Sequence, residues 1–256
     1  MNIDETIVEK FLRQEAGLEN HWIFSQIVPG EKAFEQPDCS KRDEVELLLK
    51  QITRLVKDFR PFNFDLYNVL FPQWRTITEN TTVILSVGSP APYDAMVRMK
   101  DGKEYVIFDL IRFLEYSNSG YDIERIIRQL LTHELAHICI HEDYPPIQYQ
   151  GYIERLKYTT FDEGVAHILA FAEDMMSFDF KELVRAHFEV SIRELAKALS
   201  ATDENEQKDY LVSCNAGSYW DKFAAISGKL FLAQNKTRIA ELYRAGVRPF
   251  FDELLS

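Results

Sequence analysis

The chain has 256 residues, 46% of them hydrophobic, and a formal net charge of −12 from 29 Lys and Arg against 41 Asp and Glu. It has no basic cluster, which excludes nucleic acid and anionic membranes as expected partners. It also has no apolar run long enough to span a membrane and no signal-peptide pattern, and its three scattered cysteines indicate free thiols, so a cytoplasmic location is expected.

The first part of the chain is expected to combine helices with strands. The spacing of apolar residues predicts amphipathic helices over 3–16 and 43–58. Between 81 and 109 the period changes to that of strands, with Asp101-Gly102 as a hairpin turn. The predicted strands cover 81–87, 95–99 and 104–109.

From about residue 120 onward, nearly all of the sequence has helical periodicity. The predicted helices cover 122–142, 161–176, 179–199, 218–233 and 236–245. The sequence therefore predicts an α+β, mainly helical fold that forms one unit over 1–256. Within it, an α/β lobe at 1–115 with a small mixed or antiparallel sheet precedes a helical lobe at 116–256.

One motif in the second predicted half carries metal chemistry. His133-Glu134-Leu135-Ala136-His137 matches H-E-x-x-H on a helix that Asp122 can cap. The two histidines lie one turn apart on the apolar side, where polar groups are costly unless paired, and both can bind one zinc ion. Glu134 lies beside them, within reach of a zinc-bound water. The alternative is a pair of core histidines satisfied by hydrogen bonds.

A catalytic zinc needs a third protein ligand, and the sequence offers several. His141 continues the histidine row but lies about 12 Å along an unbroken helix from His133, so one ion cannot bind both. Glu163 is the better candidate, although Thr160-x-x-Glu163 also matches a capping box at a helix start. His141, His167 and Asp162 remain residues that orient the ligands through hydrogen bonds or replace one of them.

The two motifs together resemble those of a known family. Asp162-Glu163-Gly164-Val165-Ala166 begins 25 residues after His137, and this arrangement is similar to the gluzincin metallopeptidases, which include thermolysin and aminopeptidase N. The nearest likeness is to uncharacterised zinc-dependent peptidases with EGxA on the second helix. The likeness covers about 115–235. His167 stands where thermolysin-like enzymes have Asp, and His141 gives a weaker similarity to metallopeptidases that cleave repressors.

The resemblance implies a zincin-like fold with the zinc site between its two lobes. It also implies that His133, His137 and Glu163 bind one zinc ion and that Glu134 is the general base. A tyrosine or histidine from a later helix donates to the oxyanion in that family. Tyr219 is our first choice for this role and Tyr210 the second, the alternative being that Tyr219 is only packed.

The expected function is a zinc-dependent hydrolase, most simply a peptidase with a peptide or protein substrate. A zinc hydrolase of small-molecule amides or esters, or a zinc-stabilised binding protein without activity, are the alternatives. The sequence contains no signal for the oligomeric state. The strand at 104–109, or its hairpin partner 93–99, is expected to border the zinc cleft with free backbone groups. The alternative places 104–109 in mid-sheet.

Overall fold

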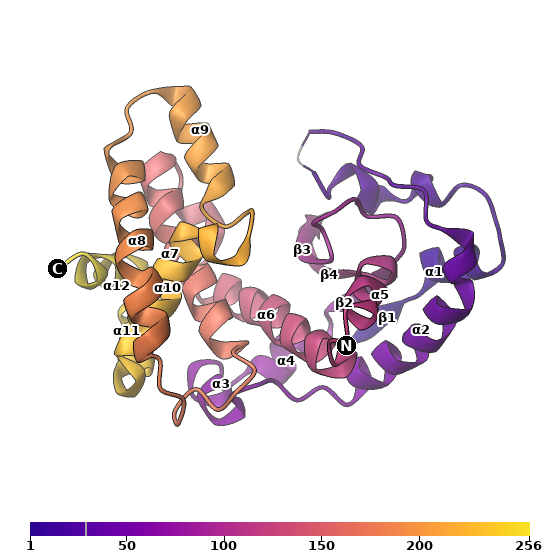
Figure 1. Ribbon diagram of the computed structural model, residues 1–256, viewed down its shortest axis with the longest axis horizontal. Helices are drawn as coiled ribbons and strands as arrows, with labels where there is room; N and C mark the ends of the chain where they lie inside the picture. Colours follow the sequence, from indigo (N-terminus) through magenta and orange to yellow (C-terminus); the bar gives the residue numbers. More distant parts are fainter. Residues whose placement is uncertain (29) are drawn as a thin grey trace. The chain divides into compact units, whose positions relative to one another are not determined.

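The computed structural model describes residues 1–28 and 30–256 (Figure 1). The chain forms two compact units, each built from two segments: Met1–Pro61 with Gln73–Ile138, and Phe62–Pro72 with Cys139–Ser256. The boundary falls inside one continuous helix, whereas the sequence analysis divided the chain at 115/116. Among the described residues, no helix combines the length and apolar character that a membrane crossing requires.

The first unit contains a four-stranded mixed sheet with the order β1-β2-β4-β3. β1, β2 and β4 are parallel, and β3 pairs antiparallel with β4. The strands are β1 (Asn2–Asp4), β2 (Thr82–Ser86), β3 (Ala95–Lys100) and β4 (Lys103–Asp109). This small sheet among many helices confirms the α+β, mainly helical class.

The hairpin of β3 and β4 forms at the predicted turn. Asp101 and Gly102 have φ values of 52° and 73°, as a two-residue turn between these strands requires. The expectation that 104–109 lies at a sheet edge is wrong, because β4 pairs with β2 on one side and β3 on the other. Its apolar run, with Val106, Ile107 and Phe108 all buried, is typical of a central strand. The edge strand is β3.

Helices pack around this sheet to form the core of the first unit. They are α1 (Thr6–Leu12), α2 (Arg42–Lys57), α4 (Trp74–Glu79), α5 (Leu110–Asn118) and the first turns of α6 (Ile123–Asp143). The predicted helix over 3–16 is divided in the structure, because the first residues pair with β2 as strand β1. Asp4 then accepts a hydrogen bond from the Thr6 backbone N–H at 3.0 Å, where the strand gives way to α1.

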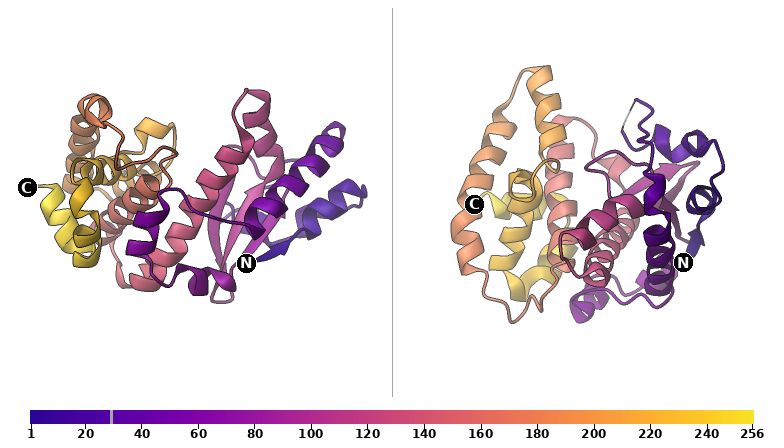
Figure 2. Two further views of the ribbon diagram at one scale, coloured as in Figure 1. Left: turned by 90° about the horizontal axis from the view of Figure 1, so that it is seen from below. Right: turned by 45° about the vertical axis from the view of Figure 1, so that its right-hand side comes forward.

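The second unit is helical, and its centre is α10, which packs against α7 and α8 (Figures 1 and 2). Its helices are α3 (Phe64–Leu70), the end of α6, α7 (Tyr152–Leu169), α8 (Lys181–Ser200), α9 (Glu204–Ser213), α10 (Phe223–Gln234), α11 (Ile239–Ala245) and α12 (Val247–Leu254). Short 3₁₀ helices connect elements in both units: η1 (Leu18–Asn20), η2 (Trp22–Ser25), η3 (Cys39–Lys41), η4 (Pro146–Gln148), η5 (Tyr219–Asp221) and η6 (Lys236–Arg238).

The helix with the second motif differs from its predicted range of 161–176, since α7 begins at Tyr152 and ends at Leu169. The side chain of Asn63 stabilises the C-terminal end of α7. Its amide donates to the carbonyls of Leu169 at 3.0 Å and Phe171 at 2.8 Å. Helix C-termini leave carbonyl groups without helical partners, and a side-chain donor satisfies them. The segment that contains α3 is thereby fixed to the rest of the second unit.

Candidate metal centre

The first motif lies on α6, which runs unbroken over 21 residues. Asp122 caps its first turn as expected, because its carboxylate accepts hydrogen bonds from the backbone N–H groups of Glu124 and Arg125. His133 and His137 face the same side one turn apart, and their Nε2 atoms are 3.0 Å from each other. Two nitrogens bound to one tetrahedral zinc at about 2.0–2.1 Å lie about 3.3 Å apart, so these rings need little adjustment to share an ion.

The last turn of α6 belongs to the second unit and packs on α7. Nε2 of His141 lies 3.7 Å from Oδ2 of Asp162, and its ring contacts that of Tyr158. Because α6 is continuous, this contact also brings His137, one turn earlier, towards the same stretch of α7.

Glu163 follows Asp162 on α7 and has neighbours of its own. Its Oε1 accepts a hydrogen bond from the Asn215 side chain at 2.9 Å, and its Oε2 lies 3.6 Å from Nε2 of His167. The capping-box interpretation of this segment is wrong. Thr160 lies inside the helix, and its hydroxyl donates to the Leu156 carbonyl at 2.8 Å.

The side chains of both motifs form two overlapping groups of metal-ligand type. The ligand atoms of His133, His137 and Glu163 all lie within 4.8 Å of one another, and those of His137, His141 and Asp162 form a second such group. Both groups contain His137, so one ion can use either but not both in full. Two imidazoles and a carboxylate fit zinc, because nitrogen and oxygen donors of this kind are its usual protein ligands.

Glu134, the proposed base, is on the buried side of α6 with 6% of its surface exposed. Arg98 on the edge strand β3 is close enough to interact with its charge. Burial lowers the pKa of the Arg98 guanidinium, and the negative charge of Glu134 acts against that shift. The guanidinium also donates to the carbonyls of Gln26 at 2.7 Å and Ile27 at 2.9 Å, which fixes its position on the strand.

Tyr219, the proposed oxyanion donor, lies beside the second motif. Its ring meets that of His167 edge-on, with 5.4 Å between the centroids. Its hydroxyl accepts a hydrogen bond from Lys229 Nζ at 2.6 Å. Although 38% of the tyrosine is exposed, its hydroxyl lies against the buried lysine, and burial raises the pKa of Tyr219 to about 12. Tyr210, the second choice, packs its ring on Phe223.

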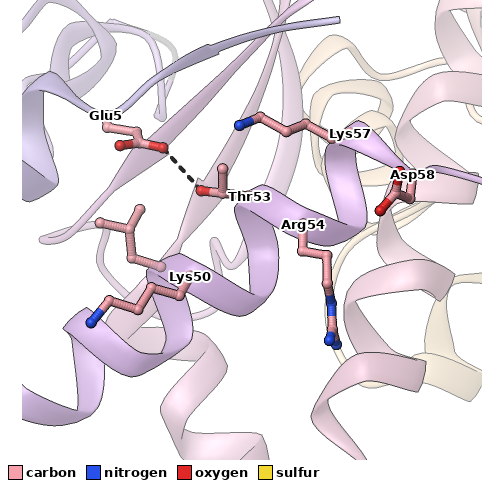
Figure 3. A pocket seen from close by; sticks show the side chains of 7 residues that line it. Glu5, Lys50, Thr53, Arg54, Lys57 and Asp58 are labelled. Atoms are coloured by element: carbon pink, nitrogen blue, oxygen red, sulfur yellow. Dashed lines mark hydrogen bonds between the residues drawn. The ribbon is translucent and has the colours of Figure 1, made fainter.

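A hollow elsewhere in the first unit involves none of these residues. It is lined by Glu5, Leu49, Lys50, Thr53, Arg54, Lys57 and Asp58 (Figure 3). Several of its polar groups have protein partners: Thr53 donates to Glu5 at 2.9 Å, Arg54 pairs with Glu124, and Lys50 pairs with Glu46.

Comparison with known proteins adds no family to this description. No protein-family model, no curated protein and no solved structure matches the chain. The inference of function rests on the site itself.

Sequence reasoning missed Lys229, Asn215 and Arg98, each of which contacts or influences a candidate site residue. The sequence contains one indication of the role of Lys229: a lysine in the otherwise apolar run of α10 breaks the pattern of a buried helix. It contains none for Asn215 and Arg98, because polar residues are common in loops and at sheet edges.

Proposed function

We propose that this chain is a zinc-dependent hydrolase of the zincin type, most simply a peptidase, which holds one zinc ion through His133, His137 and Glu163. The observation that carries the proposal is the convergence of these three donors within 4.8 Å, with Glu134 next to the first of them. Two imidazoles and one carboxylate are typical of a catalytic zinc site, which keeps a position for water, whereas structural sites normally have four protein ligands.

The chemistry is divided between the ion and the side chains around it. A zinc ion held by His133, His137 and Glu163 would lower the pKa of water towards about 7 and would polarise the carbonyl group of the substrate. Glu134 takes the proton of the attacking water and passes it to the leaving amine. The carbonyl oxygen gains negative charge during the attack, and Tyr219 donates a hydrogen bond to it.

The pairing of β4 on both sides removes one argument for a peptide over a small molecule as substrate, and β3 is the strand that could still bind a peptide. β3 is the last strand of the sheet, and an extended peptide binds most simply by pairing with such an edge. Arg98 on this strand is close enough to Glu134 for their charges to interact. Of the two strands named in the edge-strand prediction, β3, and not β4, is therefore the one proposed to bind the substrate backbone.

The test is a cleavage screen with matched variants. Zinc-loaded wild-type protein and Glu134→Gln are incubated with a mixed peptide library, and the products are identified by mass spectrometry. Cleavage by the wild type that a chelator abolishes and that Glu134→Gln lacks is the expected result. Hydrolysis confined to small esters or amides would replace the peptidase with another hydrolase, and no hydrolysis of either class would favour a binding protein.

A further inference from the structure

Lys229 is a buried cation in the apolar helix α10, with 4% of its surface exposed. In the part of the chain that the structure describes, its Nζ forms no ion pair with a carboxylate. It donates one hydrogen bond, to the Tyr219 hydroxyl at 2.6 Å. It also lies over the rings of Phe171 and Tyr219, 5.0 and 5.2 Å from their centroids. A buried ammonium with so little compensation lowers stability, so its presence calls for an explanation other than packing.

The position of Lys229 follows from a close crossing of two helices. A Cβ atom added to Gly164 would lie 2.7 Å from the Gly228 backbone, so α7 and α10 touch main chain to main chain at this point. Glu163 immediately precedes Gly164, and Lys229 immediately follows Gly228. The crossing thus brings the lysine and its tyrosine partner beside the second motif.

The hydrogen bond between the two side chains has a direction. An ammonium group can only donate, so the Tyr219 oxygen accepts and its own proton must point elsewhere. Among the described residues, no group accepts that proton. The phenol O–H is therefore held as a donor without a protein acceptor. The Tyr219 ring lies edge-on to that of His167, whose Nε2 is 3.6 Å from Oε2 of Glu163.

We propose that Lys229 is a positioning residue that holds the Tyr219 hydroxyl as a hydrogen-bond donor for the anionic oxygen of the attacked carbonyl. This inference rests on the proposed hydrolase function. The ammonium occupies the acceptor side of the phenol oxygen, so the O–H points away from the lysine. A donor that is fixed before the reaction needs no reorganisation when the charge develops.

The stability of a Lys229→Met variant separates this role from a structural one. Methionine is of similar length and apolar, so it removes the cost of burying a charge while it fills the space. The variant should be at least as stable as the wild type in urea unfolding. It should nevertheless lower kcat by about 10-fold or more with little change in KM. Lys208→Met, which removes an exposed lysine of α9, is the matched control and should change neither.

Two further readouts report on the pair itself. With 3-fluorotyrosine at position 219 of the metal-free protein, the ¹⁹F chemical shift at pH 7, where Lys229 is still charged because burial lowers its pKa only to about 8, reports on the hydrogen bond from the ammonium, and Lys229→Met should move this signal. Lys229→Arg, which keeps the charge and the donor, should restore part of both effects. His167 on α7 is the other titratable group in contact with the ring, and all variants retain it. Tyr219→Phe should lower kcat by about 10²-fold, and adding Lys229→Met to it should then have little effect.

The outcomes distinguish this inference from the proposed function. An unchanged fluorotyrosine chemical shift at pH 7, or an unchanged kcat in Lys229→Met of an active enzyme, overturns the role of Lys229 and leaves the hydrolase intact. A wild type that hydrolyses nothing overturns the function, and the donor role with it. Additive effects of Tyr219→Phe and Lys229→Met would contradict the claim that the lysine acts through the tyrosine.

Discussion

Gly228 on α10 lies directly against Gly164 on α7, so close that a Cβ atom on Gly228 would come within 2.0 Å of the Thr160 carbonyl oxygen. No side chain fits between these helices at this point. The contact matters beyond packing, because Glu163 and Lys229 are the sequence neighbours of the two glycines. The distance between the helices therefore sets the positions of one proposed ligand and of one charged group.

Gly228→Ala is expected to lower the free energy of unfolding by about 1–3 kcal/mol, because the helices must separate and overpacking outweighs the better helix propensity of alanine. It should also weaken zinc binding, because α7 moves with Glu163. Urea unfolding and a metal-competition titration measure the two effects. Ser227→Ala is the control on the same helix; it removes a buried hydroxyl that has no hydrogen-bond partner among the described residues and should be neutral or stabilising. A Gly228→Ala protein as stable as the wild type would show that the crossing is not tight.

Glu134→Gln should keep the fold and the zinc ion while it lowers hydrolysis by about 10²–10⁴-fold, because the amide cannot take a proton from water. Peptide cleavage rates and zinc content are the measurements. Glu142→Gln, at an exposed position near the end of the same helix, makes the same chemical change and should leave the rate unaltered. Equal rates for both variants and the wild type would remove Glu134 from the mechanism.

Glu163 and His141 are the two candidates for the third zinc ligand, and their removal should weaken zinc binding to different extents. Glu163→Ala removes a proposed ligand and should weaken binding by more than about 100-fold. His141→Ala removes only a residue that orients other groups and should cost about 10- to 100-fold at most. Competition with a chromogenic chelator gives both values. If the order is reversed, the ion is held by His137, His141 and Asp162 instead.

Asp109 introduces a pH dependence of stability that has nothing to do with the metal. Its carboxylate caps α5 and accepts a hydrogen bond from the Ser89 backbone N–H at 2.7 Å, but burial raises its pKa to about 6. The folded protein thus binds this proton more tightly than the unfolded chain, in which the pKa is about 3.9. The contribution of Asp109 to stability is therefore largest below pH 4 and falls as the pH rises to about 6, by about 3 kcal/mol.

Asp109→Asn lacks this titration. Unfolding measured at several pH values should show that the wild type loses stability relative to this variant between pH 4 and 6. A constant difference between the two proteins over that range would contradict the raised pKa. The lost hydrogen bond to Ser89 in the variant adds only an offset that does not change with pH.

The sequence predicted α6 well because two independent signals agree on it. The Asp122 cap and the apolar spacing predict a helix at 122–142, and the structure has Ile123–Asp143. The histidine pair follows from that helix alone. The chain could therefore be predicted to bring His133 and His137 together without knowledge of any tertiary contact.

The start of α7 was predicted nine residues too late for a physical reason. Thr160 and Glu163 have the spacing of a capping box, which suggested a helix start in the middle of a longer helix. Inside the helix, the Thr160 hydroxyl bonds to the carbonyl four residues earlier instead. Local patterns of this kind are ambiguous, because the same side chain can serve a helix end or a helix interior.

The contacts of Tyr219 and Glu163 with Lys229 and Asn215 could not be predicted from the sequence. Glu163 and Asn215 are 52 positions apart in the sequence, and the crossing at Gly164 and Gly228, which places α10 with Lys229 against α7, joins residues more than 60 positions apart. A glycine in a helix has several possible roles, and only the packed structure shows which one applies.

The central claim is that one zinc ion is held by His133, His137 and Glu163 with a coordination position left for water. Anomalous X-ray scattering above and below the zinc absorption edge, from crystals of protein purified without added metal, tests it most directly. The account predicts one peak per chain, bound by Nε2 of both histidines and the Glu163 carboxylate, with Glu134 close by but not coordinated. The absence of a zinc peak at these residues, or a peak bound by four protein side chains, would contradict it.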